Sequence, residues 1–314
     1  MRRVLITGIT GYAGSHLARD LLPSHDVYGL VREPLHGSYI ADFQEQVHLL
    51  TVDGSYAGME AAIREAQPDL VYHLAAYYTG AHGPEVTPEL IASNITFGAY
   101  LLEAMSACGC PALVYASTVM AHYAGEAYRP LNLYAATKQA FSDLLDYYTD
   151  AGLMRAVTLV LSDTYGPDDR RPKVLNLIRS AALNGETIAL SDGGQDYDVV
   201  HINDVVRAFR MAGELLIQRN GRNNEVFQVC ADKPLTLRQT VEQMLKSNDL
   251  PMETASWGQR PNADREIQKA IRLYPTLPGW SPQVDLETGL CLGGTALSHL
   301  RSSPLCCRCP GTRP

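Results

Sequence analysis

Short runs of apolar and β-branched residues alternate with longer amphipathic segments through the first half of the chain. The runs have the length and composition of buried strands, and they lie at residues 4–7, 27–31, 47–52, 70–74, 112–116 and 156–161. The segments between them have the length of helices. Parallel strands need a crossover connection, so this alternation predicts an α/β fold with a parallel sheet and helices on both of its faces.

The pattern loosens after Gly166 and Pro167 and resumes with an expected helix at residues 174–184, followed by shorter elements up to about residue 290. We therefore expect a first domain at residues 1–165 and a smaller C-terminal lobe at 166–290 that is interleaved with the last part of the sheet. Residues 291–314 offer no apolar periodicity for packing and are expected to form a poorly ordered tail.

A glycine-rich turn follows the first expected strand and opens a helix that runs to about Leu22. Gly8 turns the chain, Gly11 lets the backbone approach a pyrophosphate, and Gly14 lets the helix pack close to the strand. Unpaired N–H groups and the helix dipole favour a pyrophosphate at such a helix N-terminus. The motif predicts a doubly wound sheet of the Rossmann type, against the alternative of an ordinary tight turn. The cofactor-binding residues of this turn would be Gly8, Thr10, Gly11, Tyr12, Ala13 and Gly14.

The end of the second strand bears on the choice of cofactor. A site specific for NAD usually presents an acidic residue here to the adenosine ribose, whereas this chain has Arg32, which could meet a 2′-phosphate. We therefore favour NADP(H), with NAD(H) as the alternative, because Glu33 is adjacent and Arg32 can also be read as a surface charge. Asp53 either accepts from the adenine amino group or serves as a turn or capping residue. Further residues expected to line the cofactor are Gly54, Leu74, Ala75, Ala76 and Asn94.

Tyr134 and Lys138 are four residues apart and share one face of an expected helix that runs to about Ala151. The Lys138 ammonium is expected to lower the pKa of the Tyr134 phenol toward the working pH and to hold the nicotinamide ribose. Thr118 follows the fifth strand, where its hydroxyl can polarise a carbonyl while Tyr134 transfers the proton. Tyr and Lys at this spacing usually form a solvated face. Together with Thr118, however, they predict a catalytic centre.

In order and spacing, the glycine motif, the hydroxyl after a central strand and the Tyr134–Lys138 pair resemble the extended short-chain dehydrogenase/reductase family. The resemblance covers residues 1 to about 290 and includes the stretches 92–98, 165–167, 194–204, 278–282 and 286–290. It implies an enzyme that acts on a nucleotide-diphosphate sugar. The rival class is a dinucleotide-binding regulator without turnover, which would be expected to lack the Tyr/Lys pair.

Members of this family divide among 4,6-dehydratases, epimerases and 4-ketoreductases. The dehydratases usually carry an acid and a base just after the catalytic Thr, whereas this chain has Val119 and Met120, which cannot transfer protons. Residues 131–141 and 163–173 resemble the branch that contains the CDP-abequose and CDP-paratose synthases, which reduce a 4-keto-6-deoxy sugar. We therefore expect a nucleotide-sugar 4-ketoreductase, with a C4 epimerase as the alternative.

The resemblance also identifies positions for the substrate, with one departure. Where many relatives have Arg in the pattern Gln-x-Arg-Asp to bind the diphosphate, this chain has Tyr197. Arg171, Lys173 and Arg260 remain as cations for the diphosphate, although Arg171 and Arg260 can equally be surface charges. The expected substrate-binding residues are Thr79, Thr118, Asp163, Arg171, Lys173 and Arg260.

Charge and composition narrow the other partners. The chain has 26 Lys and Arg against 34 Asp and Glu and a pI near 5.6, so a nucleic-acid partner is not expected. The absence of a signal-like start and of an apolar stretch near 20 residues predicts a cytoplasmic protein without a membrane partner. The apolar helices expected at 89–107 and 134–151 suggest a homodimer. Metal binding is not expected at Cys306, Cys307 and Cys309, because no second ligand pair at zinc spacing accompanies them.

Overall fold

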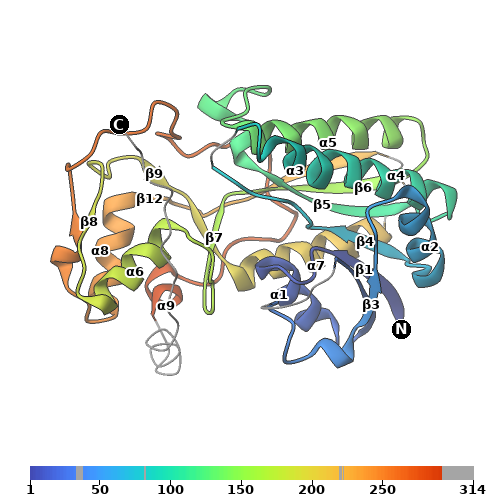
Figure 1. The fold of residues 1–314 in the computed structure, drawn as a ribbon, viewed down its shortest axis with the longest axis horizontal. Coiled ribbons are helices and arrows are strands. Elements are labelled where there is room, and N and C mark those ends of the chain that lie inside the picture. The colour runs from blue at the N-terminus through green and yellow to red at the C-terminus, as the bar shows by residue number, and fades with distance from the viewer. Residues whose placement is uncertain (33–37, 81–82, 219–220, 222, 292–314) are drawn as a thin grey trace. The chain divides into compact units, whose positions relative to one another are not determined.

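The centre of the fold is a seven-stranded sheet in the order β11-β6-β5-β4-β1-β2-β3 (Figure 1). The computed structural model describes residues 1–32, 38–80, 83–218, 221 and 223–291. All neighbouring strands of the sheet pair in parallel, which confirms the predicted fold class. The strands are β1 Arg2–Thr7, β2 His25–Val31, β3 His48–Thr51, β4 Leu70–His73, β5 Ala112–Thr118, β6 Arg155–Leu161 and β11 Asn224–Val229.

Helices cover both faces of the sheet. Because successive residues of a strand point to opposite faces, the side chains on both sides of the strands are buried. On one face, Ile6 packs in a cluster with α1 (Tyr12–Leu21) and α7 (Ile202–Gln218). On the other face, Leu5 packs in a second cluster with α2 (Tyr56–Ala66), α4 (Phe97–Ala107) and α5 (Leu133–Asp150). Figure 1 shows α4 and α5 above the sheet and α1 and α7 below it. This double burial explains why the strands read as continuous apolar runs.

The helix expected at 89–107 is interrupted. It begins as α3 (Thr87–Ile91), continues through a π-helical turn η2 (Ala92–Thr96) and ends as α4. A π-helical turn adds a residue to the turn and is frequent at functional sites. Short 3-10 turns lie at η1 (Gln44–Gln46), η3 (Val119–Ala121) and η4 (Tyr123–Gly125).

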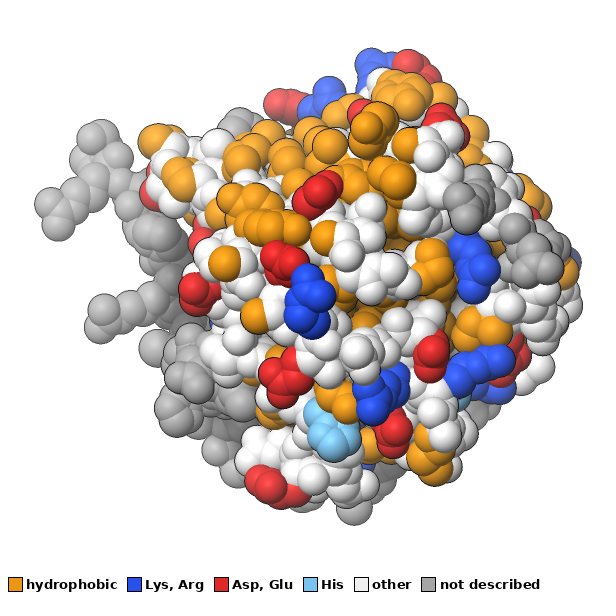
Figure 2. All heavy atoms as spheres, turned by 90° about the vertical axis from the view of Figure 1, so that its right-hand side faces the viewer, with side chains coloured by type: hydrophobic (Ala, Val, Ile, Leu, Met, Phe, Trp, Pro, Cys, Tyr) orange, Lys and Arg blue, Asp and Glu red, His pale blue; other side chains and the backbone are white. Residues whose placement is uncertain are grey.

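Hydrophobic side chains remain on the outer surface of the α3–α5 layer. Ile91 is 40% exposed and Tyr147 is 65% exposed, although both are large apolar residues. Figure 2 shows hydrophobic side chains gathered along the upper part of one face, at the height where Figure 1 places α4 and α5. An apolar surface of this kind is typical of a protein–protein contact.

The chain divides into two compact units. The first contains the sheet and comprises Met1–Tyr165, Gln195–Leu235 and Ala263–Val284. It also holds β7 (Asp163–Tyr165), which pairs in parallel with β10 (Val199–His201), and β9 (Asp196–Tyr197). The second comprises Gly166–Gly194, Thr236–Asn262 and the segment that starts at Asp285. The assignment of the first unit to the cofactor and of the second to the substrate stays a prediction.

The second unit contains three helices among its described residues, α6 (Val174–Asn184), α8 (Leu237–Ser247) and α9 (Leu286–Leu290). The helix α8 packs against both α6 and α9. A short parallel pair joins β8 (Ile188–Ala189) to β13 (Ala255–Ser256), and η5 (Met252–Thr254) precedes β13. The strand β12 (Leu235–Thr236) lies where the chain passes from the first unit to the second.

The last segment of the first unit is fastened to the start of α7. The Asp204 carboxylate is 2% exposed and accepts hydrogen bonds from the backbone N–H groups of Gln283 and Val284 at 2.9–3.0 Å. The Trp280 indole donates to the Asp204 carbonyl at 3.1 Å, and Arg207 pairs with the Asp204 carboxylate at 2.6 Å. A buried carboxylate is tolerated when it is paired and hydrogen-bonded in this way.

No helix among the described residues is long and apolar enough to cross a bilayer. Cys306, Cys307 and Cys309, together with most of the expected tail, lie outside the described residues.

Candidate active site

The carboxyl ends of the parallel strands lie along one edge of the sheet, and the predicted site residues follow these ends. At β1, Gly8 has φ +74°, and a Cβ added there would lie 2.7 Å from the Ala75 backbone nitrogen. A Cβ on Gly14 would lie 2.1 Å from the Gly8 carbonyl oxygen, so only glycine allows α1 to pack this close to the turn. The N-cap residue of α1, Gly11, is exposed, and a Cβ there would meet only the Gly8 oxygen, at 3.3 Å. The first amides of α1 are thus approachable, as the glycine motif predicts.

The neighbouring strand ends are tied to this turn. The Thr7 hydroxyl hydrogen-bonds His73 Nδ1 at 2.7 Å and accepts from the Ala75 N–H at 3.1 Å. His73 is buried and is a satisfied core histidine. Leu74 and Ala75 are half-buried beside the glycine turn, whereas Ala76 is exposed. The remaining residues of the turn are half-buried or buried: Thr10, Tyr12 and Ala13.

Arg32 and Asp53 both have partners within the protein. The Arg32 guanidinium donates to the Glu89 carboxylate at 2.9 Å; the Arg32 side chain is largely exposed, and the Glu89 side chain is about half exposed. Asp53 accepts from the N–H and the hydroxyl of Ser55 at 2.9 and 2.7 Å, and these bonds lower the pKa of its carboxyl. Ser55 caps α2, so Asp53 forms the turn before a helix, which was one of its two predicted roles. Gly54 lies between them with φ +85°.

Thr118 is the last residue of β5, and its side chain is nearly buried. Its hydroxyl oxygen accepts from the Met120 N–H at 3.2 Å. The hydroxyl proton can still be donated, which is what the polarisation of a carbonyl requires. Val119 and Met120 follow in η3 and offer no proton-transfer group.

Tyr134 and Lys138 lie one turn apart on α5, as predicted. Lys138 is 3% exposed, and its Nζ lies 4.3 Å from the centroid of the Tyr115 ring on β5. The Tyr115 hydroxyl donates to the Lys138 carbonyl at 3.0 Å. This bond fastens α5 to the strand that ends in Thr118, so the three expected catalytic residues come from two elements that pack together.

Burial dominates the acidity of the Tyr134–Lys138 pair. It raises the pKa of the Tyr134 phenol above its usual range, and the Tyr78 phenol acts in the same direction. Burial also lowers the pKa of the Lys138 ammonium to about 7. The expectation that Lys138 lowers the pKa of Tyr134 is therefore wrong for the ligand-free protein, because loss of water disfavours both charged forms. Burial therefore favours the protonated phenol.

The π-helical turn supports the first turn of α5. Asn94 is buried in η2, and its amide holds the Tyr77 backbone by accepting from the N–H at 2.7 Å and donating to the carbonyl at 3.0 Å. It also donates to the Thr137 hydroxyl at 2.9 Å, which in turn donates to the Tyr134 carbonyl at 2.7 Å. The Asn94 side chain thus has these protein partners in the ligand-free state, and it links the loop after β4 to the helix of Tyr134.

Tyr78 is a residue of the site that the sequence analysis missed. Its ring is exposed and meets the Tyr134 ring edge-on, with 4.9 Å between centroids. Partial loss of water around the phenol raises the pKa of Tyr78, and the Asp163 carboxylate acts in the same direction. The position of Tyr78, just after the fourth strand and before the expected substrate residue Thr79, was the available signal. Thr79 is half-buried.

Asp163 and Tyr197 are joined in the structure. The Tyr197 hydroxyl donates to Asp163 at 3.0 Å, so the residue that replaces the family's arginine is bonded to an expected substrate residue. Asp163 also accepts from the Thr164 N–H at 2.9 Å.

The three expected diphosphate cations belong to the second unit. Arg171 forms a bidentate pair with Asp169, with both N–O distances at 2.6 Å, and this pairing offsets its charge locally. Lys173 is the N-cap of α6 and is half-buried, whereas Arg260 is exposed.

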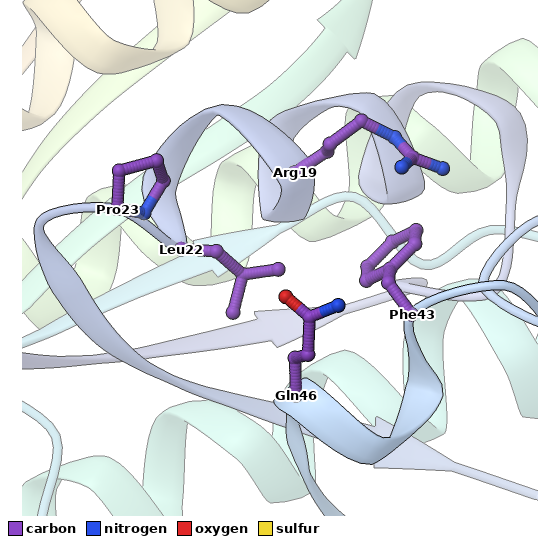
Figure 3. Close-up of a pocket in the computed structure, with 5 residues that line it drawn as sticks. All are labelled: Arg19, Leu22, Pro23, Phe43 and Gln46. Carbon is purple, nitrogen blue, oxygen red and sulfur yellow. The ribbon is translucent and has the colours of Figure 1, made fainter.

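One pocket of the first unit is separate from this site. It has a volume of about 360 Å³ and lies at the C-terminal end of α1, whereas the glycine turn lies at the N-terminal end (Figure 3). Arg19 is its charged residue, and its guanidinium is paired with Asp42 at 2.8 Å and lies over the Phe43 ring. The other lining residues are Leu22, Pro23, Phe43 and Gln46.

Comparisons with known proteins show the family to which the chain is similar. Residues 4–230 match the NAD dependent epimerase/dehydratase family. The chain is 27% identical over 243 residues to a CDP-abequose synthase of Yersinia pseudotuberculosis, a match that covers 76% of this chain and 82% of that protein. It is 29% identical over 231 residues to a UDP-glucose 4-epimerase of Mycolicibacterium smegmatis, which covers 67% of this chain and 73% of that protein.

Solved structures of this kind have the same fold. The UDP-glucose 4-epimerase of Thermus thermophilus in complex with NAD matches with a TM-score of 0.78 at 27% identity. That match covers 96% of this chain and 100% of the other. The UDP-glucose 4-epimerase of Thermotoga maritima matches with a TM-score of 0.80 at 23% identity.

Proposed function

The chain belongs to the NAD-dependent epimerase/dehydratase family, and we propose that it reduces a nucleotide-diphosphate 4-keto-6-deoxy sugar at C4. The relatives named above, a CDP-abequose synthase and UDP-glucose 4-epimerases, support a nucleotide sugar as the substrate class. The observation that carries the proposal is the placement of the three residues on two elements that pack together. Thr118 ends β5, with Val119 and Met120 next in sequence, and Tyr134 and Lys138 share the first turns of α5.

The glycine turn fits a dinucleotide. The close contact between Gly14 and the Gly8 oxygen and the open position above Gly11 leave the N-terminus of α1 accessible to a pyrophosphate. The relative from Thermus thermophilus, solved with NAD, supports a nicotinamide dinucleotide. When bound, this cofactor supplies the hydride. We favour NADPH as the donor because Arg32 follows β2, with NADH as the alternative.

The residues of the chain supply orientation and the proton. The Thr118 hydroxyl donates a hydrogen bond to the C4 carbonyl oxygen and polarises the carbonyl. Tyr134 then transfers its phenolic proton to that oxygen as the ketone becomes an alcohol. Lys138 holds the ribose of the cofactor and stabilises the phenolate that Tyr134 becomes. Each turnover uses one reduced cofactor and one proton, and solvent returns the proton to Tyr134.

The two candidate reactions start from different protonation states of Tyr134. A reduction starts with proton donation to the carbonyl, so it needs the phenol at the outset. An epimerase starts by removing the proton of the C4 hydroxyl, so it needs the phenolate. The C4 epimerase remains the alternative because the same three residues serve both reactions.

Lys173 and Arg260 are proposed to bind the diphosphate of the substrate. Arg171 would contribute if its guanidinium bonds the diphosphate while it stays paired with Asp169. Thr79 and Asp163 are proposed to contact the sugar.

Cofactor stoichiometry tests the proposal. The purified protein is incubated with CDP-4-keto-6-deoxyglucose and with UDP-glucose, each with NADPH or NADH, and both nucleotide products and cofactor absorbance are followed. One reduced cofactor consumed per alcohol formed is expected with the 4-keto sugar. Conversion of UDP-glucose to UDP-galactose without net cofactor consumption would instead establish the epimerase. Parallel reactions with Tyr134→Phe identify turnover by contaminants.

A further inference from the structure

A segment near the end of the first unit is bound along β9. We call residues 265–272 the strap. Gln195 donates to Glu266 at 2.8 Å, and the Asp196 N–H donates to the Gln268 carbonyl at 3.1 Å. The Asp196 carboxylate accepts from the Ala270 N–H at 3.0 Å.

Two ion pairs add to these bonds. Lys269 pairs with Asp196 at 3.3 Å, and Arg272 pairs with Asp198 at 2.5 Å. Three of the four residues in the stretch 195–198 are therefore partners of the strap. The fourth, Tyr197, is bonded to Asp163.

At the other end of the strap, Arg265 contacts the loop that connects Thr118 to α5. Its Nε donates to the Leu131 carbonyl at 2.9 Å, and its Nη2 donates to the Pro130 carbonyl at 2.7 Å. Its guanidinium also lies over the Tyr123 ring of the same loop, 4.6 Å from the centroid. A planar guanidinium can bridge two neighbouring acceptors, whereas a lysine ammonium has no such fork.

The two carbonyls that Arg265 holds come just before the start of the catalytic helix. Asn132 is the N-cap of α5 and accepts from the Ala135 N–H at 2.9 Å, and Tyr134 lies in the first turn. The Leu131 N–H donates back to the Met120 carbonyl at 2.8 Å, so the exit of the loop is bonded to its entry beside Thr118. Arg265 therefore binds the stretch of backbone that connects Thr118 to Tyr134.

We infer that Arg265 is a positioning residue that fixes Tyr134 relative to Thr118, and that the strap transmits the position of β9 to this loop. The inference rests on the proposed function for its catalytic consequence, but not for the tether itself. Loss of both hydrogen bonds would loosen the loop and the first turn of α5, and small displacements of a catalytic group lower turnover more than they lower ligand binding.

The tether is tested without any substrate by hydrogen–deuterium exchange of the ligand-free protein. Arg265→Met keeps the aliphatic stem and removes both donors, so peptides covering residues 119–136 should exchange faster than in the wild type. Peptides from β1 and β4 should be unchanged. Arg238→Met is the control, because Arg238 is also an exposed arginine over an aromatic ring, 5.0 Å from the Trp257 centroid, but belongs to the second unit. It should exchange like the wild type.

The catalytic consequence is tested with CDP-4-keto-6-deoxyglucose and reduced cofactor. Arg265→Met should lower kcat about tenfold, with the dissociation constant of the cofactor unchanged within about twofold. Arg265→Lys, which can restore one of the two bonds, should recover part of kcat, and Arg238→Met should be unaffected. If Arg265→Met does not fold, hydrogen–deuterium exchange and kcat are both measured on Arg265→Lys.

The outcomes separate the two proposals. Unchanged exchange at residues 119–136, or an unchanged kcat, in a folded Arg265→Met variant overturns the inference. A wild type without turnover on any nucleotide sugar overturns the proposed function, and the exchange measurement then decides the tether by itself.

Discussion

Arg32 and Glu89 form a hydrogen-bonded ion pair at 2.9 Å between the end of β2 and helix α3. Ser93 donates to the same Glu89 oxygen at 2.9 Å, and the bonds from Arg32 and Ser93 lower the pKa of the Glu89 carboxyl. The arginine that is proposed to meet a 2′-phosphate thus already has an anionic partner. A phosphate at this position would compete with Glu89 for the guanidinium.

If Arg32 meets the 2′-phosphate as proposed, this competition would make Glu89 a determinant of cofactor preference. Glu89→Gln removes the competing charge, so the affinity for NADPH should rise while that for NADH changes little. Arg32→Asp should weaken NADPH by roughly 10- to 100-fold, the equivalent of about 1.5–3 kcal/mol for a hydrogen bond to a charged group, and NADH far less. Titration of the two cofactors against each variant by calorimetry measures both effects. Equal losses for the two cofactors in Arg32→Asp would refute the role of this residue.

Tyr134→Phe tests the proton donor. The substitution keeps the ring and its edge-on contact with Tyr78 but removes the hydroxyl. Turnover should fall by roughly 10²- to 10⁴-fold, the range for a general acid, while the affinity for the cofactor stays nearly unchanged. Single-turnover reduction of the 4-keto sugar is the direct measurement. Normal turnover in this variant would mean that another residue gives the proton.

Lys138 predicts a pH-dependent proton uptake on cofactor binding. In the ligand-free protein the pKa of this ammonium is about 7, so at pH 8 the side chain is mostly neutral. If the charged form holds the ribose, binding raises the pKa, and about one proton is taken up at pH 8 and almost none at pH 5.5. Calorimetry in buffers of different ionisation enthalpy counts these protons. Lys138→Met should abolish the uptake and weaken cofactor binding.

The exposed apolar residues on the α3–α5 layer predict a homodimer. Sedimentation should show a dimer at micromolar concentration. The double variant Ile91→Glu/Tyr147→Glu should shift it toward monomer, because two charges would be buried in the interface. Tyr128→Glu, which changes an equally exposed aromatic residue of the loop before α5, is the control and should remain dimeric. A monomeric wild type would exclude this assembly.

The fold, and the positions of Thr118 on a strand end and of Tyr134 and Lys138 on one helix, could be predicted because their signals are local. A parallel strand buried on both faces reads as an apolar run, and a glycine motif or a Tyr/Lys pair lies within a few residues of sequence. The strand β11 was not predicted, since its Asn224, Glu225 and Gln228 interrupt the apolar run and its partner β6 is more than 60 residues away. The π-helical turn at η2 was also missed, because its residues fit an uninterrupted helix.

What the sequence could not indicate are the partners of charged groups. Nothing near Arg32 in sequence points to Glu89, and nothing near Arg265 points to the carbonyls of Pro130 and Leu131. The error about the pKa of Tyr134 has the same origin. Spacing places Lys138 beside it, but only the folded structure determines how much water both groups lose.

The first unit is made of three separate stretches of chain, which has a consequence for its synthesis. A nascent chain that has left the ribosome as far as residue 235 carries every strand of the sheet, yet it lacks the segment 263–284. Until that segment emerges, roughly 2–10 seconds later at ordinary rates of translation, the Asp204 carboxylate has none of the backbone donors of Gln283 and Val284. The loop before Tyr134 also lacks its hydrogen bonds from Arg265 until that residue emerges. The loop that connects Thr118 to α5 is therefore among the last parts of the unit to gain all of its hydrogen bonds as the protein is made.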